Sequence, residues 1–580
     1  MSAAMMGVYR RLCALPLALA FSGLACAAGT TGPVRTISLG EVVGSDAAVG
    51  TWTWKGIPYA QAPVGELRWK APLDPKPWTT PRAANEFGAA CASTGRFDGP
   101  GLNNRYDQTL AASLGRTVGS EDCLYLNIWR PATLEPKLPV IVFVHGGSNV
   151  SGYTADPMYD GAALARTANA VVVTVNYRLG VFGFFRSPYL RSADAAESSG
   201  NFALLDLLKS LQFVQRNIEA FGGDAGKVTL MGESAGAVNV YALLTSPLMV
   251  NARPGLAHRA LPMSGGISRA EDLPPGSVPV LLDPGYFDRQ AALLSTQSLV
   301  AGGQAPDAAG AQDWLARREP EEIARHLRSL STDAVLSLVR TQLTAANLAS
   351  SGPIADGLVM STDPIGAIRA GRYLKVPVLA GNTRDEAKLF SSLLALSPAL
   401  GGVSGRKLGD AELFELVSRY DPDAPAQLRI GQWIPATYLP VDAPGTGFNA
   451  RTGRLNAIWF SPLRDSVLDA LKSRQDTVWH YRFDWAREPA PFDDIYGASH
   501  AFDLFFTFGN FGPSVLSRVL FSKANQPGRL ALSDAMMRSI GAFARNGDPN
   551  NAALGTAWPA WPRSLLFDAT LDARRISVSP

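Results

Sequence analysis

A serine at the centre of Gly232-Glu233-Ser234-Ala235-Gly236 has the surroundings of a catalytic nucleophile, because this segment follows the pattern G-x-S-x-G. Residues 227–231 before it are short and β-prone, and residues 237–245 after it are mostly apolar, so the order is strand, sharp turn, helix. A serine on such a turn is held in a strained backbone with its hydroxyl above a sheet. The pentapeptide by itself could equally be an ordinary glycine-flanked loop. The interpretation therefore depends on the partners that acyl transfer needs.

The first partner is a base. Acyl transfer by a serine needs a base that takes the hydroxyl proton, an acid that orients the base, and N–H donors for the oxyanion. When the serine lies on a strand–turn–helix elbow, the acid and then the histidine follow it in the chain. The histidines after Ser234 are His258, His326, His480 and His500. His500 stands in a loop of small residues before an aromatic run, and we take it as the candidate base.

The other three histidines have different interpretations. His480 alternates with aromatic residues in 478–485, a pattern that predicts an exposed position on the polar face of a strand. His258 and His326 lie in segments that favour surface or structural positions. We therefore expect substitution of His480 to leave activity nearly unchanged.

Two further segments could supply the acid and the oxyanion donors. Residues 376–381 have the pattern of a sheet strand, and Asp385 and Glu386 follow it. Spacing does not separate these two carboxylates. Another apolar run, 140–144, leads into His145-Gly146-Gly147-Ser148, where small side chains would leave backbone N–H groups accessible to a developing oxyanion.

The elements that must position these groups form an α/β pattern. Apolar β-like runs recur at residues 140–144, 171–175, 228–231 and 376–379, separated by helix-like segments. This alternation predicts a parallel sheet with crossover helices. Residues 202–216 carry leucines and a valine at helical spacing on one face, so we expect a core helix there. Residues 34–59 predict a small antiparallel meander at the start.

Several segments resemble the type-B carboxylesterase and cholinesterase family, in the family's order and spacing. They are Lys55-Gly56-Ile57-Pro58-Tyr59-Ala60, residues 63–69, residues 120–128, residues 201–224 and Asn546-Gly547-Asp548-Pro549-Asn550. The resemblance covers most of the chain and is weak at about residues 270–350. It implies an α/β-hydrolase fold with a large, mostly parallel central sheet and helices on both faces.

The resemblance also assigns a Ser-Glu-His triad. Residues 381–387 are similar to the family's G-x-N-x-D-E-G, whose glutamate is the triad acid, so the resemblance implies Glu386 in this role and Asp385 as a structural ligand of the turn. Ala387 departs from the family's glycine. The loop 497–503 resembles G-A-x-H-x-x-E, which carries the family's catalytic histidine, and it therefore implies His500 as the base.

By the same resemblance, the oxyanion donors are the N–H groups of Gly147, Ser148 and Ala235, with Ser148 standing where the family usually has a third glycine. Two supporting roles are implied. Glu233 beside the nucleophile would favour the imidazolium, and Ser264 would help to hold the site.

The N-terminus predicts export. Arg10 and Arg11 precede an apolar run, 12–24, and an A-x-A cleavage site at Ala25-Cys26-Ala27, so residues 1–27 resemble a signal peptide and residues 28–580 a single domain. We expect a periplasmic or secreted enzyme. Anchoring as a lipoprotein through Cys26 is an alternative, disfavoured because Gly23 occupies the usual leucine position.

Cleavage leaves two cysteines, Cys91 and Cys123, and in an exported chain they should form a disulfide, as the resemblance also implies.

Cleavage also removes two arginines and no acidic residue, so the net charge falls from +3 to 51 − 50 = +1. A near-neutral protein is a poor partner for nucleic acid. No later stretch is apolar enough to span a bilayer.

These observations predict a carboxylic ester hydrolase that forms an acyl-enzyme on Ser234, with no cofactor and no metal site. An acyltransferase or amidase could use the same acyl-enzyme, and non-catalytic adhesion proteins share the fold but typically lose the nucleophile. The substrate, a small or a polymeric ester, and the oligomeric state are not predicted. Six aromatic residues could line a substrate pocket or fill the core: Trp314, Phe390, Trp433, Tyr438, Trp459 and Phe460.

Overall fold

The computed structural model describes residues 33–390 and 409–580, apart from residues 49, 98, 425–427, 513 and 515. The described residues belong to one compact unit. The predicted signal peptide, residues 1–27, and Cys26 within it lie outside the described residues. The domain limits 28–580 stay a prediction.

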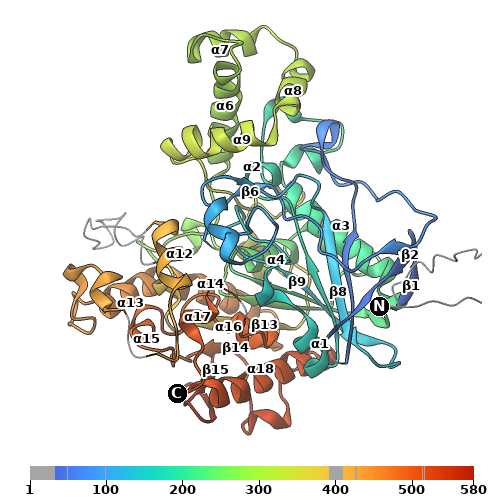
Figure 1. Cartoon of the computed structure of the whole chain (residues 1–580). Helices are drawn as coiled ribbons and strands as arrows, with labels where there is room; N and C mark the ends of the chain where they lie inside the picture. The colour runs from blue at the N-terminus through green and yellow to red at the C-terminus, as the bar shows by residue number, and fades with distance from the viewer. Residues whose placement is uncertain are drawn as a thin grey trace, which may run out of the picture. The chain divides into compact units, whose positions relative to one another are not determined.

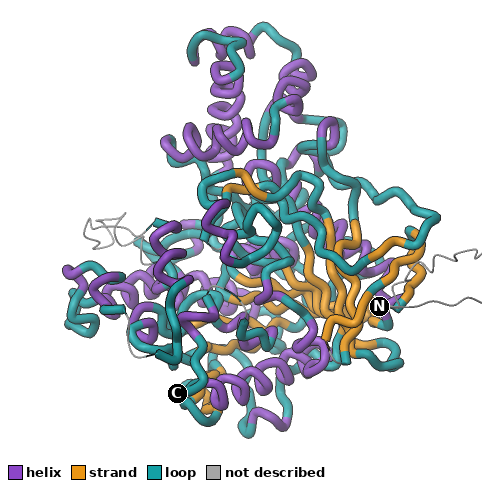
Figure 2. The backbone as a smooth tube through the Cα atoms, viewed as in Figure 1, coloured by secondary structure: helices purple, strands orange, loops and turns teal. Residues whose placement is uncertain are grey.

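A large, mostly parallel sheet lies at the centre of the molecule, with helices around it (Figures 1 and 2). Its strand order is β16-β15-β14-β13-β12-β11-β9-β10-β8-β4-β3. The strands from β10 to β15 in this order are parallel, whereas β8, β4 and β3 at one edge and β16 at the other pair antiparallel. The strands are β3 (Ser45–Ala48), β4 (Thr51–Pro58), β8 (Tyr125–Pro131), β9 (Leu138–Val144), β10 (Val171–Val175), β11 (Gly223–Glu233), β12 (Arg259–Met263), β13 (Val378–Thr383), β14 (Val478–Phe483), β15 (Leu565–Ala569) and β16 (Arg574–Val578).

The central strands are apolar along their whole length because both faces of the sheet are covered. In β9, Val140, Val142 and Val144 pack into one hydrophobic core. Ile141 and Phe143 point to the opposite face and pack into a second core. This explains why the strands appear in the sequence as continuous apolar runs, and it confirms the predicted parallel sheet.

Helices cover both faces. Helices α3, α4 and α14 contribute to the first core, and α1, α16 and α18 to the second. The predicted core helix is confirmed as α3, Phe202–Asn217. The helices are α1 (Ala162–Ala168), α2 (Gly180–Gly183), α3, α4 (Ala235–Leu244), α5 (Pro247–Val250), α6 (Pro284–Ala301), α7 (Ala308–Ala316), α8 (Pro320–Ser329), α9 (Thr332–Leu338), α10 (Pro364–Arg369), α12 (Asp410–Ser418), α13 (Phe448–Ile458), α14 (Phe460–Lys472), α15 (Phe492–Ile495), α16 (Asp503–Phe508), α17 (Ser517–Leu520) and α18 (Gln526–Asn546).

The predicted N-terminal meander divides between two sheets. Strands β1 (Val34–Ile37) and β2 (Gly40–Val43) pair antiparallel and join β5 (Arg82–Ala83) in a small sheet. Strands β3 and β4 also pair antiparallel, but β4 continues the large sheet through its pairing with β8. A third, two-stranded sheet consists of β6 (Ser93–Thr94) and β7 (Thr117–Val118).

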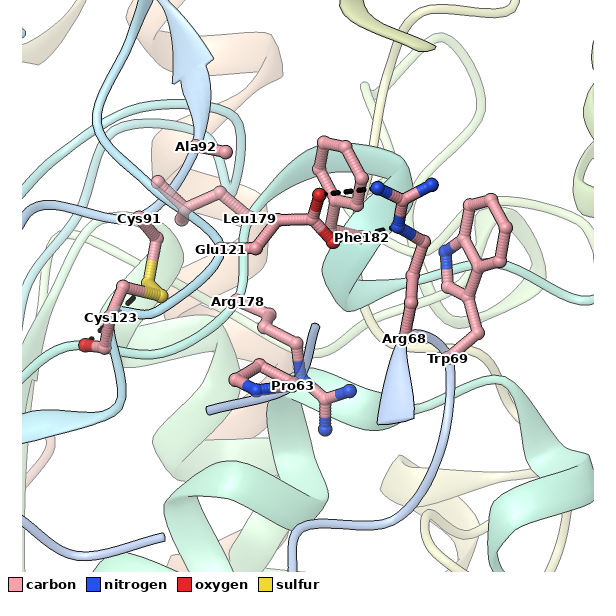
Figure 3. A pocket seen from close by; sticks show the side chains of 10 residues that line it. All are labelled: Pro63, Arg68, Trp69, Cys91, Ala92, Glu121, Cys123, Arg178, Leu179 and Phe182. Atoms are coloured by element: carbon pink, nitrogen blue, oxygen red, sulfur yellow. Dashed lines mark hydrogen bonds and ion pairs between the residues drawn. A yellow bond between two sulfur atoms is a disulfide. The ribbon is translucent and has the colours of Figure 1, made fainter. Parts of the chain in front are cut away.

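The segments 63–69 and 120–128, which are far apart in the chain, meet in a buried ion pair (Figure 3). Arg68 donates from Nε and Nη2 to the two carboxylate oxygens of Glu121, at 2.7 and 2.6 Å. Its Nη1 also donates to the carbonyl of Leu330, between α8 and α9, at 2.6 Å. The disulfide Cys91–Cys123 lies beside this pair, so the predicted cysteine pairing is confirmed.

The region of weak resemblance, about 270–350, holds helices α6 to α9, which extend away from the large sheet (Figures 1 and 2). Their apolar side chains, such as Leu294, Leu327 and Val335, form a smaller core together with Trp69 and Phe182. Over the described part of the chain, none of the helices combines the length and apolar character that crossing a membrane requires.

Candidate active site

Ser234 occupies the turn between β11, which ends at Glu233, and α4, which begins at Ala235. Its backbone has φ 55° and ψ −123°, a conformation that is strained for a residue with a side chain. A Cβ on Gly232 would collide with the carbonyl of Gly236, and a Cβ on Gly236 with that of Val144. Both glycines are therefore required where strand and helix approach most closely, as the pattern predicts. Ser234 is half-buried, while its neighbours on both sides are buried.

The histidine and the acid meet at the carboxyl end of the sheet. Nδ1 of His500 lies 2.6 Å from Oε2 of Glu386, although the two residues are 114 positions apart. His500 is 3% exposed and Glu386 is 1% exposed. The other oxygen of Glu386, Oε1, accepts from the hydroxyl of Ser264 at 2.7 Å, from the amide of Asn382 at 2.9 Å and from the N–H of Thr383 at 2.9 Å. The acid is thereby held at both oxygens.

Asp385, which the sequence left in competition with Glu386, faces elsewhere. Its Oδ2 accepts from the N–H of Ala498 at 3.0 Å, and its own N–H donates to the carbonyl of Ala498 at 2.8 Å. It also forms an ion pair with Arg384 at 2.7 Å. Asp385 therefore fastens the loop that carries the histidine, and Glu386 is the carboxylate that contacts it.

Glu233 brings a second buried carboxylate to the histidine. Its Oε1 lies 3.1 Å from Nε2 of His500, and both side chains are almost fully buried. This contact is not a hydrogen bond, and within the described residues Nε2 has no hydrogen-bond partner. This nitrogen is therefore free to receive a proton from a nucleophile.

The electrostatic balance favours a protonated histidine. Burial by itself lowers the pKa of His500, but the charges of Glu233 and Glu386, together with the hydrogen bond that His500 donates to Glu386, outweigh it and raise the pKa. Burial raises the pKa of Glu233 against the pull of His500. Because the two groups interact so closely, their protonation steps belong to the pair.

The loop after β9 lies directly against the nucleophile. A Cβ on Gly146 would come within 2.6 Å of Oε2 of Glu233 and 2.8 Å of Cβ of Ser234. Three consecutive residues have positive φ: Gly147 at 96°, Ser148 at 56° and Asn149 at 58°. The N–H groups of Gly147 and Ser148 make no hydrogen bond within the described part of the chain. Ala235 is the first residue of α4, where an N–H has no partner inside the helix.

The prediction that His480 is exposed is wrong. His480 is fully buried on β14, with its Nδ1 2.7 Å from the hydroxyl of Ser564 and its Nε2 3.3 Å from Oδ1 of Asn382. The ring of Trp561 packs on it at 5.4 Å. Strand alternation placed the ring on the less apolar face of β14, but the segment before β15 covers that face with Trp561 and Ser564, and Val478 on the same face packs into the first core.

His258 and His326 have partners other than Ser234, Glu386 and His500. Nδ1 of His258 accepts from the N–H of Val228 at 3.3 Å, and Nε2 of His326 lies 3.0 Å from the hydroxyl of Ser298. Sequence reasoning also missed Asp503, a buried carboxylate that accepts from the hydroxyl of Tyr481 at 2.7 Å and whose pKa burial raises to about 6.

The six aromatic residues separate into different groups. The rings of Phe390 and Phe460 lie 4.9 and 5.3 Å from that of His500, and Trp459 packs on both phenylalanines. By contrast, Trp433 packs on Phe492 and Tyr496, and Tyr438 is buried in the same core. Trp314 lies near His326 in the region of α6 to α9. Phe390 and Phe460 therefore lie beside His500, with Trp459 packed against them.

The strand order, the elbow after a central parallel strand and the buried histidine–carboxylate pair define an α/β-hydrolase. The chain belongs to the carboxylesterase family, whose family model matches residues 31–567. It is 31% identical to the para-nitrobenzyl esterase of Bacillus subtilis over 553 residues, which cover 94% of this chain and 95% of that protein. It is also 31% identical to the fumonisin B1 esterase of Sphingopyxis macrogoltabida over 560 residues, 94% of this chain and 88% of that one.

Solved structures agree with this assignment. A structure of PNB esterase superposes with a TM-score of 0.68 at 27% identity, covering 95% of this chain and 98% of that one. A carboxylesterase of Geobacillus stearothermophilus superposes with a TM-score of 0.66 at 30% identity, covering 94% and 98%. The enzyme class is serine carboxylesterase, which hydrolyses carboxylic esters.

Proposed function

We propose that this esterase works through an acyl-enzyme on Ser234, with His500 as the base and Glu386 as the acid of the triad. The observation that carries the proposal is the buried contact of 2.6 Å between Nδ1 of His500 and Glu386. It fixes the tautomer with a proton on Nδ1, so that Nε2 is the nitrogen that accepts the proton of the nucleophile.

The reaction follows from these positions. Nε2 of His500 takes the hydroxyl proton of Ser234 while Oγ attacks the ester carbonyl carbon, and the carbonyl electron pair moves onto its oxygen. The N–H groups of Gly147, Ser148 and Ala235 stabilise that oxyanion. The tetrahedral intermediate collapses as His500 gives its proton to the leaving alcohol. Water, deprotonated by His500, then attacks the acyl carbon, and His500 returns the proton to Oγ of Ser234 as the carboxylic acid leaves.

Two buried groups support this cycle. The charge of Glu233 near Nε2 favours the imidazolium that forms in each transition state. The hydroxyl of Ser264 donates to Glu386 and so keeps the acid in place. The aromatic rings of Phe390, Trp459 and Phe460 around His500 favour an ester with an apolar acyl or alcohol group at this point.

Covalent labelling tests the assignment. A fluorophosphonate should label the wild-type protein on Ser234, identified by mass spectrometry of the peptide. Ser234→Ala should not be labelled, and its turnover of a p-nitrophenyl ester should fall on the order of 10⁴-fold or more while the fold is kept. His500→Ala should lose activity to a similar extent, whereas His258→Ala, the matched control, should not. Labelling at another residue, or Ser234→Ala within about tenfold of wild type, would exclude this mechanism.

The same assays address the alternatives. An adhesion protein of this fold would not be labelled by the fluorophosphonate. A transferase would convert added alcohols to new esters faster than water hydrolyses the acyl-enzyme, which product analysis detects. Ester hydrolysis is favoured because the relatives that match the chain over nearly its whole length are esterases.

We also propose that the enzyme is exported to the periplasm or the medium. The disulfide Cys91–Cys123 supports this location, because such bonds persist in oxidising compartments. Fractionation of cells that express the full chain, with N-terminal sequencing of the mature protein, tests it. A cytoplasmic protein that retains residues 1–27 would contradict the proposal.

A further inference from the structure

A second buried histidine, His480, is connected to the acid of the proposed triad. It lies on β14 with no exposed surface, and burial lowers its pKa well below the usual value, so the ring is neutral. A buried imidazole costs free energy unless both nitrogens form hydrogen bonds. Both do: Nδ1 is 2.7 Å from the hydroxyl of Ser564, and Nε2 is 3.3 Å from Oδ1 of Asn382.

Asn382 is the link between this histidine and the acid. It lies on β13, the strand paired with β14, and its Nδ2 donates to Oε1 of Glu386 at 2.9 Å. Its side chain is buried, with 7% exposed. Because the ionised Glu386 can only accept hydrogen bonds, the amide must turn its NH₂ toward Glu386 and its oxygen toward His480.

The orientation of the amide fixes the tautomer of His480. Oδ1 of Asn382 accepts, so Nε2 of His480 must carry the proton. Nδ1 is then an acceptor and takes a hydrogen bond from the hydroxyl of Ser564. Every donor in the series Ser564, His480, Asn382 therefore points toward Glu386, and hydrogen bonds aligned in this way strengthen one another.

The end of this series, together with two other donors, sets the rotation of the Glu386 carboxylate. Oε1 of Glu386 accepts three hydrogen bonds, one of them from Asn382. Oε2 is therefore the oxygen that faces Nδ1 of His500, at 2.6 Å. We propose that His480 is a positioning residue: through Asn382, it holds the carboxylate of Glu386 in the rotation that orients the catalytic base. This inference rests on the proposed triad.

Two polar substitutions of His480 separate this role from space filling. In His480→Gln the side-chain NH₂ can take the place of Nε2–H and donate to Asn382. In His480→Asn the shorter amide reaches the position of Nδ1 and Ser564, but not Asn382. We expect His480→Gln to keep kcat within about twofold of wild type, and His480→Asn to lose about threefold to tenfold in kcat with little change in KM, the effect of one hydrogen bond. His480→Met should resemble His480→Asn, and His258→Met, the matched control, should resemble wild type.

A double-mutant cycle tests whether the effect passes through Asn382. Asn382→Leu should lower kcat by itself, and adding His480→Met should lower it no further, because the connection is already cut. The far-downfield proton NMR signal of the hydrogen bond between His500 and Glu386 gives a readout that loss of packing alone would not move in this pattern. It should shift in His480→Met and in His480→Asn, but not in His480→Gln.

Equal kcat values and an unchanged NMR signal in His480→Gln, His480→Asn and His480→Met would overturn the inference, as would fully additive losses in the cycle. If His480→Met does not fold, the comparison of Gln with Asn decides by itself, since both are neutral amides. If neither amide variant folds, Ser564→Ala provides the test. Its NMR signal must be shifted from that of the wild-type protein, or the inference fails. Failure of the triad itself is distinguishable, because Ser234→Ala would then keep activity whatever His480 does.

Discussion

Ser148 gives the sharpest test of the proposed oxyanion hole, because its backbone and its hydroxyl can be separated by substitution. Its φ is 56°, in the left-handed region. An L-residue other than glycine loses about 1–2 kcal/mol there. Glycine would relieve this strain but makes the unfolded chain more flexible, which offsets about 0.4–1 kcal/mol. Ser148→Gly should therefore leave the fold unchanged or stabilise it by up to about 1.5 kcal/mol.

Proline at this position is not a clean test of the donor. Proline removes the N–H group, but its ring also holds φ near about −65°, far from the observed angle. Because Gly147 and Asn149 on either side also have positive φ, the loop would have to rearrange as a whole. A loss of activity in Ser148→Pro would then have two causes. Ser148→Ala is better, since it keeps the N–H and removes only the hydroxyl.

The expected turnover follows from which group is the donor. If the N–H group is the donor, Ser148→Ala and Ser148→Gly both keep kcat within about tenfold of wild type, since the donor survives. Loss of one oxyanion donor costs about 10²–10³ in kcat. The assay is steady-state hydrolysis of a p-nitrophenyl ester, with thermal melts of each variant and Ser151→Ala as the control for a hydroxyl lost from the same loop. A hundredfold loss in a well-folded Ser148→Ala, with Ser151→Ala normal, would show that the hydroxyl is the working donor and would refute the backbone assignment.

Three further predictions follow from the site and its supports. The raised pKa of His500 should place the acid limb of the pH profile of kcat/KM above the ordinary histidine value of about 6.5. Glu233→Gln should move that limb to lower pH, because one charge that favours the imidazolium is gone. A limb that stays in place or moves to higher pH in this variant would contradict the assigned cause of the raised pKa. Replacing Cys91 and Cys123 together by alanine should destabilise the fold by roughly 3–4 kcal/mol on the loop-entropy estimate, seen as a lower melting temperature, and an unchanged melt would show that the bond contributes little. Asp385→Asn should weaken the contact of this residue with the loop that carries His500, and should lower kcat about threefold to tenfold with little effect on KM. Equal kcat values in wild type and variant would mean that the charge of Asp385 is not needed to position this loop.

The sequence by itself determined the parts of this site whose geometry is local. The elbow at Ser234 needs residues without a side chain at Gly232 and Gly236, because a Cβ at either position would collide with a backbone carbonyl. That requirement is visible as a pattern of five residues. The central strands were also predictable, because burial of both faces makes them continuous apolar runs, as in residues 140–144.

Only the tertiary structure decided which groups meet across long separations. Asp385 and Glu386 are adjacent in the chain, and their spacing from His500 is nearly the same, so spacing left them equivalent; the resemblance favoured Glu386. In the fold, Oε2 of Glu386 contacts the imidazole of His500, whereas the carboxylate of Asp385 accepts a hydrogen bond from the backbone N–H of Ala498. The direction of a side chain at the end of a strand depends on the loop packed against it, which comes from a distant part of the chain.

His480 shows that strand alternation by itself does not predict burial. Alternation along a strand tells which residues share a face, but it does not tell whether a distant segment of the chain covers that face. Here the segment before β15 covers the ring with Trp561 and Ser564, and the pairing of β13 with β14 brings Asn382 to its other nitrogen. A side chain that the pattern placed in water therefore lies in the core, because burial is a property of the assembled sheet and not of one strand.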